Sequence, residues 1–231
     1  MAKVAKRLIS AFRGHMPDIG IEAVLAGVGI DWRSAAGGKM FRYVTLLAKW
    51  NSRVNLVSST RPAILTPLIQ EALWAAERYP SDSRAHLDIG SGAGFPAIPL
   101  AIIRSEVEIT MVESRERKAA FLQTVVCDLE LGNVQVENQR LDNFLRRSPA
   151  PGPWDCVSWK AVKLSARDFS RLLAATAEHV RFWMFHGADL PAEDASLIDE
   201  SLQLNRRDAC PFHAGWFLSE FRRKTVSRET G

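Results

Sequence analysis

The sequence has few cysteines and no long apolar run. None of its apolar stretches approaches the roughly 20 residues needed to cross a bilayer. The N-terminus lacks the basic start, apolar core and small-residue cleavage site of a secretory signal, so we expect a cytoplasmic protein without a membrane partner. Its three cysteines, Cys127, Cys156 and Cys210, are an odd number without metal-ligand spacing. Cys210 and His213 alone would make half a zinc site, so the sequence predicts free thiols in a reducing compartment and no metal.

Positive charge is unevenly spread along the chain. Residues 1–61 hold ten Lys or Arg and three acidic residues, a charge of +7, which leaves −3 of the total +4 for the remainder. Lys and Arg neutralise phosphates, so a basic segment on a mildly acidic body indicates a polyanionic partner such as RNA. The alternative is an ordinary solvated helix face, and the charges alone favour neither interpretation.

Apolar periodicity divides the chain into a helical first part and an alternating second part. Residues 1–80 show helical spacing, for example over 2–12 and 40–50, with breaks at 27–32 and 35–38. From residue 84 onward, short strands alternate with amphipathic helices, which is typical of a mostly parallel sheet. Strands are expected within residues 85–90, 106–113, 133–138, 154–159, 181–187 and 215–223. We therefore predict an α/β protein, with a basic helical cap over residues 1–80 and a Rossmann-like domain over residues 81–231.

A glycine-rich turn follows the first predicted strand. Gly90, Gly92 and Gly94 lie between that strand and a helix that holds Pro96 in its early turn. Open α/β sheets bind ligands at this position, and the free N–H groups of a helix N-terminus favour an anionic group nearby. Glycine allows a ligand to approach the backbone closely and allows positive φ. The alternative is a purely structural turn.

The spacing of the glycines argues against two common nucleotide motifs. A dinucleotide fingerprint needs glycine where this chain has Phe95, and a P-loop needs a Gly-Lys-Ser/Thr sequence that does not follow here. Glu113 ends the next strand and can accept hydrogen bonds from ribose hydroxyls. Asp88 lies two residues before the first glycine, and the resulting pattern Asp-x-Gly-x-Gly-x-Gly resembles the first motif of class I S-adenosylmethionine-dependent methyltransferases. This resemblance implies S-adenosylmethionine as the cofactor, with a dinucleotide-dependent oxidoreductase as the alternative.

Four stretches between residues 41 and 162 carry a more specific resemblance. They are LLAKWNSRVNLVSS, LDIGSGAGFPAIPLAI, VESRERKAAFLQ and NVQVENQRLDNF. Together they resemble the bacterial family that methylates N7 of a guanosine in 16S ribosomal RNA, also called glucose-inhibited division protein B. The resemblance implies cofactor contacts from Gly90, Phe95, Leu141 and Asp142, with Asp142 accepting from the adenine amino group. Alternatively, Phe95 belongs to the core and Asp142 begins a helix.

The chain departs from this family where the acceptor is expected to dock. The family's Ser-Arg-Ala-Phe after the fourth strand is Trp159-Lys160-Ala161-Val162, its early Arg-His pair is Pro67-Leu68, and its later Lys-Gly is His186-Gly187. Lysine keeps the charge of arginine but loses the planar fork that binds carboxylate or phosphate through two bonds. We expect Lys160 near the reacting centre, contacting the cofactor carboxylate or an RNA phosphate. Trp159 either stacks on a base or belongs to the core.

The resemblance implies methylation of guanosine N7 in the 16S rRNA of the small ribosomal subunit. Guanine N7 has a free lone pair, so no general base is required and positioning is the main task. The basic residues within 1–61 would contact backbone phosphates. Two further alternatives are a methyltransferase acting on a small molecule or another RNA, and a non-catalytic RNA-binding module. The sequence does not indicate the oligomeric state.

Overall fold

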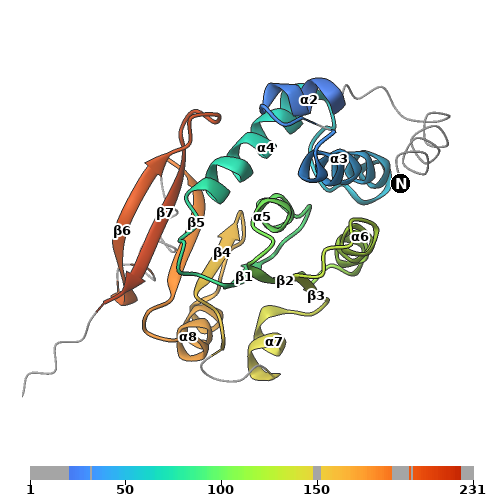
Figure 1. The fold of residues 1–231 in the computed structure, drawn as a ribbon. Coiled ribbons are helices and arrows are strands. Elements are labelled where there is room, and N and C mark those ends of the chain that lie inside the picture. The colour runs from blue at the N-terminus through green and yellow to red at the C-terminus, as the bar shows by residue number, and fades with distance from the viewer. Residues whose placement is uncertain (1–20, 32, 148–151, 189–197, 199, 225–231) are drawn as a thin grey trace, which may run out of the picture.

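The computed structural model describes residues 21–31, 33–147, 152–188, 198 and 200–224. Seven of its segments form one sheet: β1 Ala85–Ile89, β2 Glu108–Val112, β3 Val134–Glu137, β4 Cys156–Lys160, β5 Arg181–Gly187, β6 Leu202–Ala209 and β7 Trp216–Arg223. The strand order is β3-β2-β1-β4-β5-β7-β6 (Figure 1). Strands β1 to β5 run parallel, whereas β7 pairs antiparallel with both β5 and β6. The sheet places the carboxyl ends of the five parallel strands at one edge.

Helices cover both faces of this sheet. On one face lie α2 Ile21–Gly27, α3 Ala35–Val54, α4 Pro62–Glu77, α5 Ala97–Ile103 and α6 Glu116–Asp128, and on the other lie α7 Leu141–Arg147 and α8 Ala166–Ala175 (Figure 1). The predicted alternation of strands and helices is confirmed from β1 to β5. Pro62 is the first residue of α4, a position where its missing N–H removes no helical hydrogen bond.

Helix α3 begins earlier than the sequence pattern predicts. The glycines at 35–38 suggest a break, but this prediction is wrong, because α3 begins at Ala35 and includes both of them. The Ser34 side chain caps the helix by accepting from the Gly37 N–H at 3.0 Å. This cap and the buried face that begins at Gly37 offset the low helix propensity of glycine, about 1 kcal/mol per residue. The helix expected over residues 2–12 lies outside the described residues.

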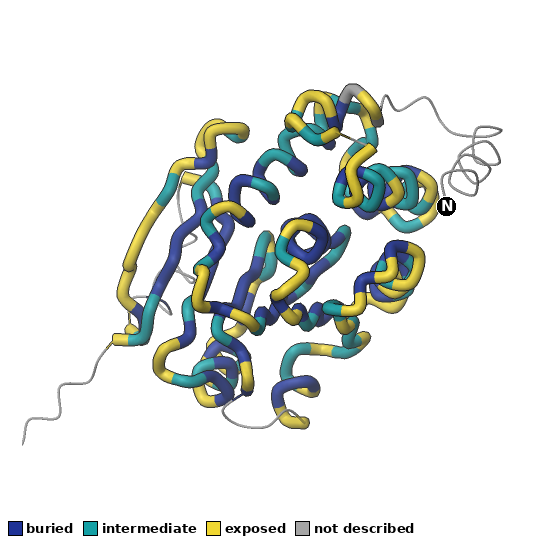
Figure 2. The backbone as a smooth tube through the Cα atoms, in the orientation of Figure 1, coloured by how far each residue is buried: buried dark blue, intermediate teal, exposed yellow. Residues whose placement is uncertain are grey.

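Strand β6 is a strand that the sequence analysis did not predict. Leu202 is buried, but the residues that follow it, 203–207, are exposed. Figure 2 shows this strand exposed along the outer edge of the sheet. An edge strand with one paired neighbour and little burial lacks the alternating apolar pattern by which strands are found in a sequence.

The cap helices and the sheet share one hydrophobic core. Its buried members include Leu25 of α2, Tyr43 of α3 and Leu65 of α4, together with Ile109 and Met111 of β2. Helices α3 and α4 pack on α5 and α6, so the helical segment is joined to the sheet by continuous apolar contacts. Whether residues 1–80 act as a separate unit stays a prediction.

A second core lies on the face covered by α7 and α8. Trp159 belongs to it, is 3% exposed, and has its ring 6.5 Å from that of Phe182. This burial supports the core interpretation of Trp159 and leaves its ring no free face for a base.

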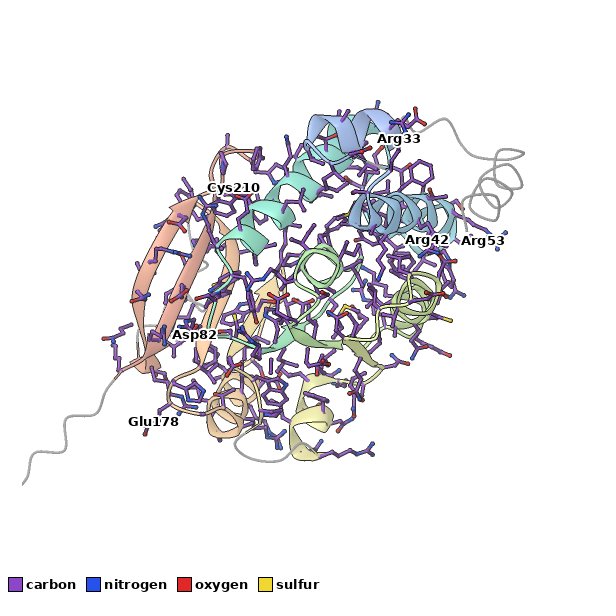
Figure 3. All side chains as sticks on the ribbon, viewed as in Figure 1. Arg33, Arg42, Arg53, Asp82, Glu178 and Cys210 are labelled. Carbon is purple, nitrogen blue, oxygen red and sulfur yellow. The ribbon has the colours of Figure 1, made fainter. Side chains whose placement is uncertain are left out.

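Basic side chains are found on the cap. Figure 3 shows Arg33, Arg42 and Arg53 near α2 and α3, and Asp82 and Glu178 at the other side of the molecule. Arg42 Nε lies 3.9 Å from Asp128 Oδ2, and an exposed ion pair of this kind contributes little to stability.

All three cysteines are free thiols. Over the described ranges, no helix is long and apolar enough to span a membrane. Among the same residues, no three His, Cys, Asp or Glu side chains are grouped to hold a metal ion.

Candidate active site

The glycine-rich turn leads from β1 into α5. Gly90 has φ +70°, and a Cβ at this residue would lie 2.4 Å from Val162 Cγ2, so only glycine fits without movement. Gly92 has φ +55°, but the nearest atom to an added Cβ is the Gly90 carbonyl oxygen at 3.6 Å. Packing within the protein therefore requires glycine at Gly90, whereas a Cβ at Gly92 would make only ordinary van der Waals contacts.

A pocket opens beside Gly90 at the carboxyl edge of the parallel strands. Residues that follow β1, β2, β3 and β4 line it, including Gly90, Ser114, Leu141, Asp142 and Val162. Three residues predicted to bind the cofactor, Gly90, Leu141 and Asp142, thus lie around one cavity. Ligands of open α/β sheets bind at this edge.

Asp142 presents an unsatisfied oxygen at this pocket. Its Oδ2 atom accepts from Arg146 Nη2 at 2.9 Å and lies 3.6 Å from Arg171 Nη1. Its Oδ1 atom is buried and lies 3.8 Å from Arg140 Nε, too far for a hydrogen bond, and it has no hydrogen-bond partner among the described residues. A buried acceptor without a partner is costly, so this oxygen fits a ligand donor such as an amino group. Asp142 also lies in the first turn of α7, where a negative charge favours the helix, so both predicted roles are compatible.

Glu113 connects the end of β2 to the glycine turn. Its carboxylate is buried, and its two oxygens accept from the Arg115 N–H at 2.7 Å and from the Gly92 N–H at 2.9 Å. These two hydrogen bonds fix the glycine turn against the end of β2. The sequence does not reveal them, because they form only when the turn folds back over β2. A carboxylate oxygen has more than one lone pair, so the predicted ribose contact is compatible with this geometry.

Asp88 lies beneath the turn in a buried hydrogen-bond chain. Its Oδ1 accepts from the Ser158 hydroxyl at 2.6 Å, and Ser158 Oγ lies 2.8 Å from His86 Nε2. Burial raises the pKa of Asp88 to about 6 and lowers that of His86 to about 3, so His86 is neutral. When the Ser158 hydroxyl donates to Asp88, His86 donates from Nε2. Asp88 Oδ2 and His86 Nδ1 have no hydrogen-bond partner within the described part of the chain.

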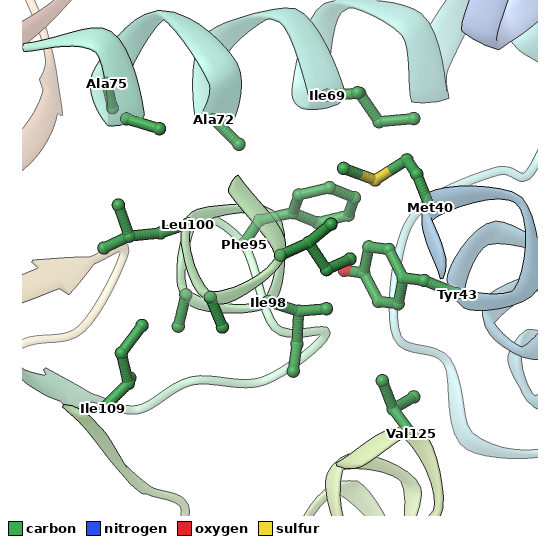
Figure 4. Packing of buried hydrophobic residues seen from close by; sticks show 14 of the residues in the cluster. Met40, Tyr43, Ile69, Ala72, Ala75, Phe95, Ile98, Leu100, Ile109 and Val125 are labelled. Carbon is green, nitrogen blue, oxygen red and sulfur yellow. The ribbon is translucent and has the colours of Figure 1, made fainter. Parts of the chain in front are cut away.

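Phe95 lies on the side of the turn that faces the cap. It is 9% exposed, and its ring stands edge-on to that of Tyr43 with centroids 5.4 Å apart. Figure 4 shows Phe95 below α4 and close to Met40 and Tyr43. The Tyr43 hydroxyl donates to the Ala93 carbonyl oxygen at 2.7 Å, so α3 is tied directly to the glycine turn. This packing supports the core interpretation of Phe95, and its contact with a cofactor stays a prediction.

Lys160 ends β4 but does not line the pocket beside Gly90. Its ammonium forms an ion pair with Glu71 of α4, whose side chain is 2% exposed. His213 Nδ1 lies 3.2 Å from the other oxygen of the same carboxylate. The sequence analysis did not identify Glu71 or His213 as site residues, because neither belongs to a motif and both are far from Lys160 in the chain.

The glycine turn, the acidic residue after β2 and the pocket beside Gly90 fit an adenosine-containing ligand with an amino-acid tail. Asp142 Oδ1 and Asp88 Oδ2 are buried acceptors without a hydrogen bond from the described residues, which suits a ligand that carries amino groups. With five parallel strands followed in the sheet by the antiparallel β7, these features define the class I S-adenosylmethionine-dependent methyltransferases. A solved structure described as a SAM dependent methyltransferase from Aquifex aeolicus has this fold, with a TM-score of 0.53 and 14% identity, covering 68% of this chain and 90% of that one.

Sequence comparison identifies the family within this class. The model of the family rRNA small subunit methyltransferase G matches residues 37–203. Ribosomal RNA small subunit methyltransferase G of Nitrosomonas eutropha is 37% identical over 175 residues, covering 73% of this chain and 77% of the relative. The protein of that name from Methylobacillus flagellatus is 29% identical over 179 residues, covering 77% and 84%. The chain belongs to the rRNA small subunit methyltransferase G family and is an S-adenosylmethionine-dependent methyltransferase.

Proposed function

We propose that this protein methylates N7 of a guanosine in the 16S rRNA of the small ribosomal subunit. The family supports this class of substrate. The observation that carries the proposal is the pocket beside Gly90, where Asp142 Oδ1 is a buried acceptor that makes no hydrogen bond with the described residues. An enzyme with this role acts on ribosomal subunits in the cytoplasm.

In this proposal, each cofactor-binding residue contacts a different part of the ligand. Gly90 and Leu141 shape the pocket, and Asp142 Oδ1 accepts from the adenine amino group. Glu113 accepts a hydrogen bond from a ribose hydroxyl. The hydrogen bonds that it accepts from the Gly92 and Arg115 N–H groups hold the turn. Asp88 Oδ2 accepts from the ammonium group of the methionine moiety. When bound, S-adenosylmethionine supplies an electrophilic methyl group on a sulfonium.

The protein side chains act in this reaction by positioning. Guanine N7 offers an unprotonated lone pair, so no residue has to remove a proton before methyl transfer. Lys160 lies at the end of β4, and Glu71 holds its ammonium in one orientation. Alignment of two reactants can lower a barrier by about 7–11 kcal/mol in the best cases, so positioning can supply a large share of the rate enhancement without acid–base catalysis.

The cap supplies the contact with RNA in this proposal. Residues 1–80 form a basic cap that contacts backbone phosphates, and residues 81–231 bind the cofactor. Lys49 and Arg53 are exposed on α3 and illustrate this basic surface. Guanine N7 faces the major groove, which is deep and narrow in A-form RNA, so the target nucleotide is unpaired or distorted.

The proposal is tested on ribosomal RNA from cells that lack the gene. Mass spectrometry of their 16S rRNA is expected to show the loss of one 7-methylguanosine. The purified protein should restore it with S-adenosylmethionine, and an Asp142→Ala variant should restore it less efficiently at a limiting cofactor concentration. Unchanged 7-methylguanosine in these cells, or methyl transfer to a small metabolite and not to subunits, would contradict the proposed substrate.

A further inference from the structure

The β6–β7 hairpin brings aromatic and titratable residues to the end of β4. Residues 204–223 of this hairpin lie beyond the region that matches the family. Trp216 is in register with Gly187 at the end of β5, next to Lys160 and Phe185, which are paired between β4 and β5. The hairpin therefore extends the site at the edge of the sheet where the parallel strands end.

Glu71 joins three distant parts of the chain in this region. Its carboxylate accepts from the Lys160 ammonium and from His213 Nδ1, the latter at 3.2 Å. Lys160 Nζ lies 5.6 Å from the centroid of the Trp216 ring and 5.8 Å from that of Phe185. Because an ionised carboxylate only accepts, the His213 ring carries a proton on Nδ1 when this hydrogen bond forms.

Exposure within the cluster differs from member to member. The Glu71 side chain is 2% exposed, that of Lys160 16% and that of His213 29%. Trp216 is partly buried against the core, and Phe212 in the hairpin turn is 38% exposed. Glu71 is thus the buried support, while the histidine and the indole remain accessible from solvent.

A buried charge cluster of this kind is a poor device for stability alone. Removing a carboxylate and an ammonium from water costs several kcal/mol per ion, and apolar residues of similar size often stabilise a fold better. Titratable groups gathered at a ligand-binding edge are instead typical of functional sites. The position of the cluster at the end of β4, at the ligand-binding edge of the sheet, indicates that it faces the acceptor.

We propose that Trp216 and His213 form part of the subsite for the target base, an unpaired guanine of RNA. In this subsite the Trp216 ring stacks on the base, as aromatic rings do in single-stranded RNA recognition. Glu71 is a positioning residue that holds Lys160 and His213 at the rim. This inference rests on the proposed function.

The chemistry of the reaction suits an indole at this place. As the bond between N7 and the methyl carbon forms, the bond from that carbon to sulfur breaks and its electron pair stays on sulfur. The positive charge thereby moves onto the guanine. An aromatic face attracts a cation, so the Trp216 ring favours the charged product-like base, whereas the charge of the Glu71 carboxylate is already paired with the Lys160 ammonium.

The test compares Trp216→Leu with Trp216→Phe. Leucine keeps apolar packing of the hairpin but removes the aromatic face, whereas phenylalanine keeps both. Methyl transfer is measured on small ribosomal subunits that lack the modification, and affinity for S-adenosylhomocysteine is measured by calorimetry. Trp216→Leu is expected to raise KM for the subunits about 5- to 100-fold and to leave the S-adenosylhomocysteine Kd within about twofold, whereas Trp216→Phe retains most of the wild-type activity.

A second variant uses a less buried residue, with a matched histidine as control. His213→Ala is expected to raise KM in the same direction. His179→Ala is the control, because the His179 side chain is 69% exposed and its Nε2 lies 3.7 Å from Asp155 Oδ1. His179 and Asp155 precede β5 and β4, so they lie at the opposite end of these strands from Lys160. His179→Ala is expected to behave as the wild type.

The possible results separate the two proposals. If the wild-type protein methylates subunits and both Trp216→Leu and His213→Ala keep its KM, the base subsite is refuted. If these variants lose S-adenosylhomocysteine binding in parallel with activity, their role is structural and the inference is also overturned. If the wild-type protein binds S-adenosylhomocysteine but transfers no methyl group to subunits, the proposed function itself fails.

Discussion

Replacing Gly90 with alanine tests how the glycine turn and the pocket depend on each other. An added Cβ would lie 2.4 Å from Val162 Cγ2, and φ at this residue is +70°. Val162 lines the pocket and has a branched, stiff side chain, so the clash is relieved only if Val162 moves and the pocket changes shape. We expect Gly90→Ala to weaken both the fold and cofactor binding.

The size of the effect follows from two costs. A positive φ costs a residue with a Cβ about 1–2 kcal/mol, and overpacking a filled site costs typically about 1–3 kcal/mol. Together they predict a loss of about 2–5 kcal/mol in the free energy of unfolding. Displacement of Val162 should raise the Kd of S-adenosylhomocysteine about tenfold or more, which corresponds to at least about 1.4 kcal/mol.

Two further variants separate backbone strain from the clash. Gly92→Ala has a φ of +55° but no atom closer than 3.6 Å to its Cβ, so only the strain applies to its stability. Val162→Ala removes the Cγ2 atom and leaves Val162 Cβ at 3.6 Å from a Cβ at Gly90, an ordinary contact. In this background the stability cost of Gly90→Ala should fall by about 1–3 kcal/mol, a coupling typical of residues in contact.

Urea unfolding and calorimetry with S-adenosylhomocysteine measure these effects. Gly90→Ala should destabilise more than Gly92→Ala, and Val162→Ala should restore much of the loss. A Gly90→Ala variant with wild-type stability and affinity would refute the reasoning, as would a loss that Val162→Ala does not reduce.

Three other predictions address the groups around the turn. The pKa of Asp88 is about 6 in the folded protein and 3.8 ordinarily, so the folded state binds more protons between these values. The free energy of unfolding should therefore fall by up to about 3 kcal/mol as pH rises from about 4 to 6. Asp88→Asn should flatten this pH dependence in urea titrations. If the free energy of unfolding of this variant still falls over the same pH range, other groups cause the dependence. Asp142→Ala should raise the Kd of S-adenosylhomocysteine about tenfold but leave unchanged that of S-inosylhomocysteine, which lacks the adenine amino group. Equal losses of affinity for both ligands in calorimetry would contradict the contact. Tyr43→Phe removes the 2.7 Å hydrogen bond to the Ala93 carbonyl and should lower stability by about 1 kcal/mol, whereas an unchanged urea midpoint would show that this bond contributes nothing net.

Local patterns in the sequence were sufficient to predict much of the fold and one side of the site. The strands β1 to β5 and the helices between them follow from apolar periodicity, which depends only on neighbouring residues. Gly90, Leu141 and Asp142 could be assigned to one pocket from the motif and the family resemblance, because the carboxyl ends of parallel strands meet at one edge. The start of α3 at Ala35 could have been found from the capping side chain of Ser34, but the glycines at 35–38 obscured it.

Only the tertiary structure decided which residues gather at the end of β4. Lys160 finds its partner Glu71 at a distance of 89 residues in the chain, and Glu71 meets His213 at a distance of 142 residues. Phe95 was directed into the core by the cap that packs over the glycine turn. Strand β6 formed because β7 returns antiparallel beside β5 and offers it an edge. Periodicity and motifs determine what each segment becomes, but contacts between distant segments depend on how the cap and the final hairpin pack against the sheet.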